Sequence, residues 1–205
     1  GMITWQKLAR LTLEHLTLSL SAVLLAIAVA VPAGILLSRS RRLADPVITV
    51  VGLFQTLPAI ALLAFMIPLM GIGTKPALTA LFLYALLPIL SNTCKGLLGV
   101  DPSVKEAARG MGMTPLQMLL TVELPLAFRV IMSGIRTSTV LIIGWATLGA
   151  YVGAGGLGEP IVSGYAMVSP KLILAGGVPV TLMALLADFL LGRLERKVTP
   201  RGLQV

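Results

Sequence analysis

Residues 16–38 read LTLSLSAVLLAIAVAVPAGILLS, an apolar stretch without a single charged side chain. A helix needs roughly 20 apolar residues to cross a bilayer core of about 30 Å, so this stretch is long enough for one crossing. The whole chain of 205 residues is 57% hydrophobic and only 12% charged, with a mean hydropathy of +0.97. Because a soluble domain carries about 25% charged residues, the composition excludes a soluble enzyme, a disordered tail and a nucleic-acid-binding module as descriptions of the whole chain.

Four further apolar stretches predict an all-α, polytopic membrane protein with about five transmembrane helices in one domain, residues 1–205. The turn-forming sequence GIGTKP at 71–76 separates the second span from the third, and Pro58 and Pro68 are expected to kink or shorten the second. Gly176, Gly177 and Pro179 are expected to break the fifth span. The predicted spans are residues 16–38, 46–74, 76–94, about 130–158, and 172–187.

The first span has a competing interpretation as a cleaved signal peptide, because residues 28–30 (AVA) resemble a cleavage site. The apolar run continues to Leu37, however, and basic residues follow at Arg39, Arg41 and Arg42. This is a stop-transfer pattern, so we expect the span to be retained.

The net charge of +8 is explained by topology. Eleven basic residues fall in alternate loops and in the C-terminal tail, at positions 39, 41, 42, 95, 105, 109, 129, 193, 196, 197 and 201. The opposite loops hold four, at 7, 10, 75 and 171. The positive-inside rule therefore predicts that the N-terminus lies outside and the C-terminus in the cytoplasm, and no nucleic-acid partner is needed.

The longest loop, residues 92–129, is predicted to lie in the cytoplasm and to contain two short helices. Asp101 can cap a helix whose first residue is Pro102, and Gly110 or Gly112 can end it in a left-handed conformation.

The second helix of this loop is predicted from a capping box, in which Thr114 is the cap, Pro115 the first residue and Gln117 the reciprocal partner. It is expected to stop before Pro125, since a proline disfavours helical geometry in the residue before it. The two helices are interpreted either as an amphipathic element on lipid headgroups or as a docking surface for another protein. Alternating charges and small residues count against the lipid interpretation, but exposed small-residue patches are only suggestive, so both interpretations stay open on these features alone.

The order of residues in this loop resembles the EAA loop of ABC importer permeases. Glu106-Ala107-Ala108 is followed after three residues by Gly112, and then by Val122 and Leu124-Pro125 at the family's spacing, with Val122 in place of the usual Ile. The resemblance implies coupling helices that sit in a groove of a cytoplasmic ATPase, with Glu106 as a polar contact and Gly112 as the bend. The implied coupling residues are Glu106, Ala107, Ala108, Gly110, Gly112, Leu124 and Pro125.

The stretches at 55–58, 71–77, 105–112, 134–137 and 153–158 resemble more narrowly the permeases of osmoprotectant importers for glycine betaine, carnitine and choline. The likeness covers about residues 14–202 and implies a MetI-like fold in the bacterial inner membrane. It also implies partners: cytoplasmic ATPase subunits, an extracytoplasmic substrate-binding protein, and a second permease subunit, identical or paralogous. No cofactor is expected on this chain, since it has no phosphate-binding Gly-x-x-x-x-Gly-Lys motif and ATP would bind the partner ATPase.

No catalytic constellation or metal site is predicted, because the chain has a single histidine, His15, and a single cysteine, Cys94. The ten aromatic residues are scattered rather than gathered into a cage for a quaternary ammonium group. The resemblance implies that substrate selectivity lies instead in the separate binding protein.

Residues 153–158 (GAGGLG) fit the G-x-G-x-x-G pattern of dinucleotide sites, but no strand and helix of the required unit surround them. We interpret the glycines as allowing close backbone packing at the outer end of the fourth span. A gate, or a docking surface for an external partner, is the functional hypothesis for Gly153, Gly155, Gly156 and Gly158.

Arg136 and Asp188 are ionisable residues near the ends of spans. Arg136 is expected to extend to the headgroups, while Asp188 can pair with Arg136 across two helices or with Arg193. Three functions remain open at this point: an ATP-driven importer for quaternary amines or another zwitterion, a secondary transporter or channel without ATP, and a membrane anchor.

Overall fold

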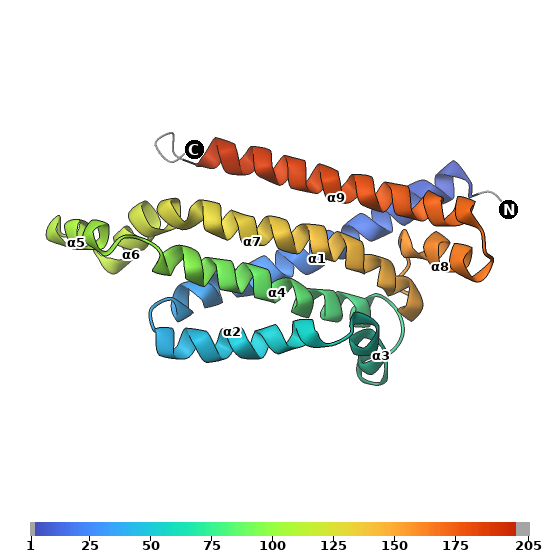
Figure 1. The fold of residues 1–205 in the computed structure, drawn as a ribbon, viewed down its shortest axis with the longest axis horizontal. Helices are drawn as coiled ribbons and strands as arrows, with labels where there is room; N and C mark the ends of the chain where they lie inside the picture. Colours follow the sequence, from blue (N-terminus) through green and yellow to red (C-terminus); the bar gives the residue numbers. More distant parts are fainter. Residues whose placement is uncertain (1–2, 200–205) are drawn as a thin grey trace.

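The computed structural model describes residues 3–199, and their regular structure is helical (Figure 1). The α-helices are α1 (Trp5–Leu37), α2 (Arg41–Thr56), α3 (Ala59–Met70), α4 (Thr74–Leu98), α5 (Pro102–Gly110), α6 (Pro115–Met118), α7 (Leu124–Trp145), α8 (Gly158–Ala166) and α9 (Pro170–Val198). A π-helical segment, Leu119–Glu123, joins α6 to α7, and a 3₁₀ segment, Ala146–Val152, follows α7. Among the described residues, four continuous helical stretches are long and apolar enough to cross a membrane, and a fifth crossing results if α2 and α3, bent by 96°, count as one.

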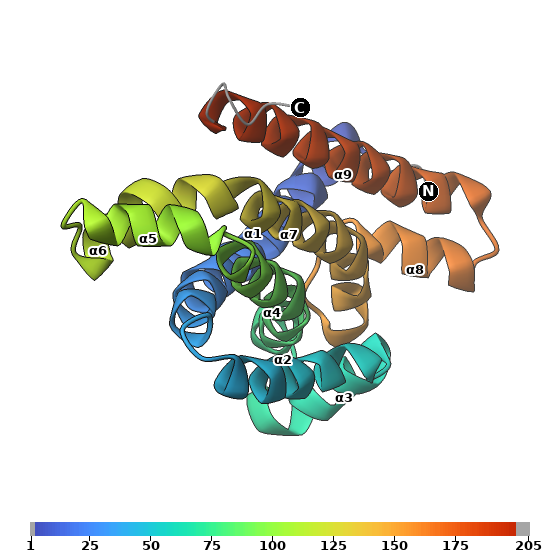
Figure 2. The same ribbon diagram turned by 60° about the vertical axis from the view of Figure 1, so that its left-hand side comes forward.

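Helix α4 lies at the centre of the bundle, between α1, α7 and the α2–α3 pair (Figure 2). In the most apolar stretch of α4, 50% of the residues are buried. In the corresponding stretch of α9, which lies at the periphery, only 11% are buried. Small residues permit the close contacts: a Cβ on Gly34 of α1 would lie 2.7 Å from the Thr93 side chain, and one on Gly134 of α7 would lie 2.5 Å from the Pro88 carbonyl oxygen. Small residues at such interfaces let helix backbones approach in membranes.

The bend between α2 and α3 is held by hydrogen bonds to α4. The residue before Pro58, Leu57, has the extended geometry that a following proline favours. Pro88 in α4 has no N–H, so the Tyr84 carbonyl lacks its helical partner, and Gln55 Nε2 donates to it at 3.0 Å. The Tyr84 hydroxyl in turn donates to the Leu57 carbonyl at 2.7 Å. The predicted kink at Pro58 is thereby confirmed.

The fifth predicted span is wrong in one respect: α9 runs unbroken through Gly176, Gly177 and Pro179. Gly176 is buried where α9 crosses α8, and a Cβ there would lie 2.5 Å from the Leu157 carbonyl oxygen. The glycine is therefore required by packing against α8 and does not break the helix. Small residues at helix contacts in membranes let the backbones approach closely.

The prediction that the second loop helix stops before Pro125 is also wrong. Leu124 has α-helical angles, and its N–H donates to the Leu119 carbonyl in a π-helical pattern. The chain therefore passes from α6 into α7 without a stop, with Pro125 in the first turn of α7, where a missing N–H is tolerated.

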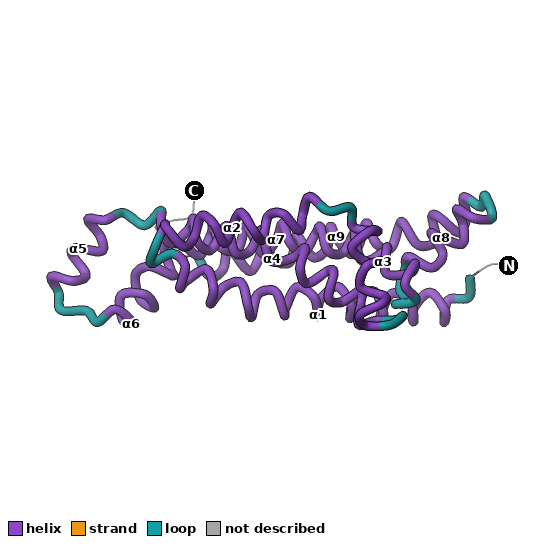
Figure 3. The backbone as a smooth tube through the Cα atoms, turned by 90° about the horizontal axis from the view of Figure 1, so that it is seen from below, coloured by secondary structure: helices purple, strands orange, loops and turns teal. Residues whose placement is uncertain are grey.

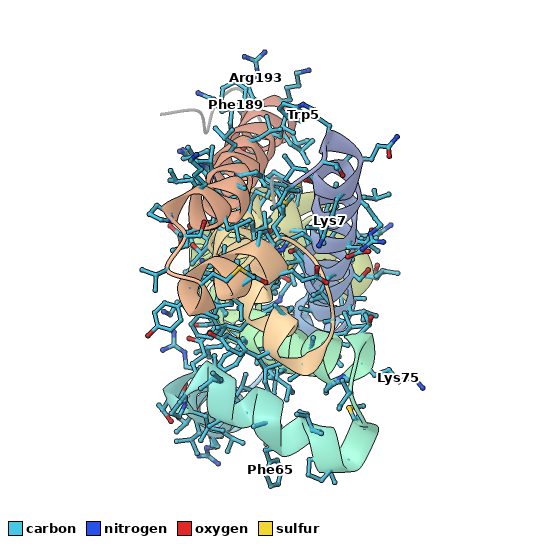
Figure 4. All side chains as sticks on the ribbon, turned by 90° about the vertical axis from the view of Figure 1, so that its right-hand side faces the viewer. Trp5, Lys7, Phe65, Lys75, Phe189 and Arg193 are labelled. Carbon is cyan, nitrogen blue, oxygen red and sulfur yellow. The ribbon has the colours of Figure 1, made fainter. Side chains whose placement is uncertain are left out.

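The two ends of the bundle differ in charge. The α5–α6 pair projects beyond the long helices at the end where α1 and α9 finish, and α8 and the start of α1 lie at the opposite end (Figures 1 and 3). Ten of the eleven predicted cytoplasmic charges lie toward the α5–α6 end, and Arg201 lies outside the described residues. Lys7, Arg10, Lys75 and Lys171 lie toward the α8 end, onto which Figure 4 looks.

Candidate functional site

Helix α5 begins and ends as its sequence predicts. The Asp101 carboxylate accepts a hydrogen bond from the Ser103 N–H at 2.8 Å, and Pro102 occupies the first helical position. The bonds from the Ser103 N–H and hydroxyl hold the pKa of Asp101 below its usual value. After Gly110 the chain turns at Gly112, whose φ of +79° is in the left-handed region.

The capping box of α6 is complete. The Gln117 N–H donates to Thr114 Oγ1 at 3.3 Å, and the Thr114 N–H donates to Gln117 Oε1 at 2.9 Å. Because each cap satisfies donors that a free helix end would leave open, both short helices have fixed starting points. The loop thus presents a rigid helical pair rather than a flexible connection.

The exposed face of α5–α6 differs from the one implied by the EAA resemblance. Glu106, Ala107, Gly110 and Gly112 are exposed, as a docking surface requires, but Ala108 is only 1% exposed. Ala108 lies on the side of α5 that packs against the rest of the chain, and its implied role in coupling stays a prediction. Exposed apolar side chains lie close by in the sequence: Val104 on α5, Met111 directly after it, Leu116 on α6 and Leu120 in the π-helical segment.

A buried acid not singled out in the sequence lies beneath this pair. The Glu123 side chain is 1% exposed, and Arg39 binds both its oxygens, with Nη1–Oε1 and Nη2–Oε2 distances of 3.1 and 2.7 Å. Lys105 Nζ of α5 lies 3.8 Å from Glu123 Oε1 and donates to the Leu97 carbonyl at 3.3 Å. The sequence does show that Glu123 is an acid among apolar residues just before Leu124. Nothing in the local pattern indicates its partner, Arg39, which lies 84 residues earlier.

Leu124 and Pro125, the other two implied coupling residues, are half-buried at the start of α7. Leu124 packs on a small core of Leu97, Ala127 and Ile131, which joins α4 to α7. These residues therefore support the base of the projecting pair and are not part of its exposed face.

The glycine loop at the other end packs tightly, as expected. Gly153, Gly155 and Gly156 all have positive φ, and a Cβ on Gly158 would overlap the Thr147 carbonyl. The Glu14 carboxylate of α1 accepts a hydrogen bond from the Gly156 N–H at 3.1 Å. No strand occurs in residues 3–199, so the dinucleotide interpretation has no structural basis here.

His15, next to Glu14, is fully buried against this loop. Its Nε2–H donates to the Ile143 carbonyl at 2.8 Å, near the point where α7 tightens into the 3₁₀ segment, while Nδ1 has no hydrogen-bond partner within the described residues. The first helix is thereby fastened to the C-terminal end of the fourth span and to the glycine loop. The described residues contain no group of three or more His, Cys, Asp or Glu side chains that could hold a metal ion.

The ion pair expected between Arg136 and Asp188 is present. Arg136 Nε lies 3.0 Å from Asp188 Oδ1, and its Nη1 lies 3.0 Å from the Glu195 carboxylate, a partner not foreseen. Arg193, the alternative partner of Asp188, lies over the Phe189 ring at 5.7 Å instead (Figure 4). A cavity of about 540 Å³ opens beside the pair, lined by Ser133, Arg136, Thr137, Val140, Leu141 and Asp188.

Comparisons with known proteins agree on one family. A family model described as binding-protein-dependent transport system inner membrane component matches residues 22–200. The chain is 55% identical to the carnitine transport permease protein OpuCB of Listeria monocytogenes, over 94% of this chain and 88% of that protein. It is 51% identical to the glycine betaine/carnitine/choline transport system permease protein OpuCB of Bacillus subtilis, over 93% and 88%.

Among solved structures, a chain of the MetNI methionine ABC transporter in an inward-facing conformation matches with a TM-score of 0.85. The sequences are 27% identical, and the match covers 95% of this chain and 97% of that one. The expected MetI-like fold is confirmed.

Proposed function

The chain belongs to the family of binding-protein-dependent transport system inner membrane components, and from this premise we propose that it is the permease subunit of an ATP-driven importer for osmoprotectant quaternary amines. Glycine betaine, carnitine and choline are the solutes in the names of relatives at 51–55% identity. The chain is a multi-pass inner-membrane protein, and we propose that its N-terminus is outside and its C-terminus in the cytoplasm, because the basic side chains gather at the α5–α6 end.

The observation that carries the proposal is the projecting pair α5–α6. Its exposed face combines the apolar Met111 and Leu116, 71% and 64% exposed, with the charged Glu106 and Arg109. Exposed apolar patches rimmed by polar groups are typical of protein interfaces. The fixed caps and the bend at Gly112 keep this face rigid, as a surface that transmits force to a cytoplasmic ATPase requires.

The remaining partners follow from the same function. Closure of two ATPases on ATP would move α5–α6 and switch the side to which the solute path opens, a rigid-body alternating-access cycle. A second permease would complete the path, since the four or five crossings of one chain enclose little space. ATP would bind to the ATPase subunits, and this chain would bind no cofactor. A binding protein would deliver the solute at the α8 end, where Gly153, Gly155, Gly156 and Gly158 form the proposed gate or docking loop.

Uptake coupled to ATP hydrolysis tests the proposal. The complex purified with its ATPase is reconstituted in liposomes, and labelled glycine betaine taken up per ATP hydrolysed is compared between Gly112→Asn and Gly112→Val. The φ of +79° costs a residue with a Cβ about 1–2 kcal/mol, and Asn adopts it more readily than a β-branched residue. We expect the Asn variant to stay near the wild-type ratio and the Val variant to fall well below it. Uptake by the wild type without ATP, or failure to bind any ATPase, would reject the proposal.

A further inference from the structure

The buried carboxylate of Glu123 lies where the projecting pair α5–α6 meets the membrane-spanning helices. We propose that Glu123 is the positioning residue that transmits movement of α5–α6 to α1, an inference that rests on the function proposed above. We call Glu123, Arg39 and Lys105 together the Glu123 hub.

The hub has the geometry of a strong, directional contact. Arg39 forms two hydrogen bonds to Glu123, at 2.7 and 3.1 Å, one to each carboxylate oxygen. Paired bonds of this kind fix orientation as well as distance. Lys105 supplies a second cation at 3.8 Å, so a carboxylate that is 1% exposed has its charge compensated on two sides.

The three residues come from separate parts of the fold. Arg39 lies in the turn between α1 and α2, Lys105 on α5, and Glu123 at the end of the π-helical segment that leads into α7. Lys105 also donates to the Leu97 carbonyl in the last turn of α4. The Glu123 hub therefore ties the projecting pair to the end of α1, the end of α4 and the start of α7.

The other contacts of α5–α6 indicate that Glu123 transmits movement of this helix pair and does not only anchor it. The buried side chains of the pair, Ala108 and Met118, are apolar, and apolar contacts can slide without a large loss of energy. The Glu123–Arg39 contact cannot slide, because separating it would leave a charge buried without its partner. When α5–α6 moves, the turn at the end of α1 must move with it. The π-helical segment that carries Glu123 is a geometry often found at functional sites.

The test compares Glu123→Gln and Arg39→Lys with the matched control Asp45→Asn, in the complex purified with its ATPase and reconstituted in liposomes. Asp45 is an exposed acid at the same end of the molecule, so its amide variant removes the same charge outside the hub. Three quantities are measured: the amount of ATPase retained, the rate of ATP hydrolysis, and the labelled glycine betaine taken up per ATP hydrolysed. Transmission predicts that Glu123→Gln keeps the ATPase and its hydrolysis but takes up about tenfold less solute per ATP, as expected for losing one charge-assisted contact. Arg39→Lys keeps the charge without the paired geometry and should fall in between, and Asp45→Asn should match the wild type.

A purely structural anchor would instead lose the ATPase, or lower uptake and hydrolysis in proportion. Either result, or an unchanged ratio, would overturn the proposal. Hydrogen exchange measured on the solubilised chain without ATPase gives an independent arm. Glu123→Gln should speed exchange in α5 relative to Asp45→Asn. If Glu123→Gln does not fold, Arg39→Lys takes its place in this comparison. Equal exchange would also overturn it. If the wild type binds no ATPase, the proposed function fails, and the exchange arm still decides whether the hub links α5 to the bundle.

Discussion

Two neighbouring glycines of α9 provide a sharp test of the fold. Gly176 faces α8: a Cβ there would lie 2.5 Å from the Leu157 carbonyl oxygen and 2.7 Å from Ile161 Cγ1. An ordinary contact needs about 3.4 Å, so α9 would have to move by about 0.9 Å. A Cβ on Gly177 meets no atom within 4 Å among the described residues. The same Gly→Ala change is therefore expected to have opposite effects at adjacent positions of one helix.

The magnitudes can be estimated separately. Ala in place of Gly within a helix gains about 0.5–1 kcal/mol, which is the whole effect expected at Gly177. At Gly176 overpacking costs about 1–3 kcal/mol, so that after the helix gain is subtracted the net loss is about 1 kcal/mol at the middle of both ranges. For a chain of this size a loss of about 1 kcal/mol corresponds to a Tm lower by roughly 2–4 °C.

Thermal unfolding of the detergent-purified protein measures both variants against the wild type. Gly177→Ala should unfold at the same or a slightly higher temperature, and Gly176→Ala at a lower one. If the two variants shift the Tm equally, or if Gly176→Ala is the more stable of the two, then α9 does not pack on α8 as the structure has it.

Three further predictions concern single polar contacts. Gln55→Leu removes the donor to the Tyr84 carbonyl and should destabilise the protein by about 1–3 kcal/mol, seen as a lower Tm; a Tm equal to the wild type would show that the bend needs no such bond. Arg136→Met should speed hydrogen exchange in the second half of α9. The ion pair lost is expected to contribute only about 1 kcal/mol, because Asp188 is 45% exposed. Adding Asp188→Asn to this variant should recover part of the protection. The pKa of Asp101 is lowered in the folded protein, so its capping contribution is complete above the unfolded value of about 3.9 and is lost as the pH falls through the folded value. The protection of α5 amides, taken as the intrinsic exchange rate at each pH divided by the observed rate, should therefore fall on acidification. In Asp101→Asn, where the cap does not titrate, this acid-dependent fall should be absent.

Local chemistry made much of the fold predictable. The caps at Asp101 and Thr114 depend on residues within three positions of each other, and the turn before α4 depends on Gly71 and Gly73, whose φ values of +81° and +124° suit glycine alone. These signals need no knowledge of the rest of the chain. The apolar runs likewise predicted the spans, because the need for apolar side chains in a bilayer acts on each helix separately.

The sequence was insufficient where a distant part of the chain determines the role of a residue. Gly176 was taken to break α9, but its role is set by the Leu157 carbonyl on the other side of a helix contact. Whether Ala108 is buried or exposed depends on which side of α5 packs against the bundle. The sequence of a short helix with small residues does not show which side that is. Glu123 went unrecognised because its partner Arg39 lies on another helix end, 84 residues earlier.

We expect this chain to convert ATP hydrolysis on another subunit into solute movement through its own membrane helices. Uptake of labelled glycine betaine is measured into liposomes containing the purified complex and its binding protein, with ATP or a non-hydrolysable analogue at the ATPase side. Uptake should occur with ATP, and none above background with the analogue. Equal uptake under the two conditions would show that ATP hydrolysis does not drive transport and would favour a transporter or channel that works without ATP.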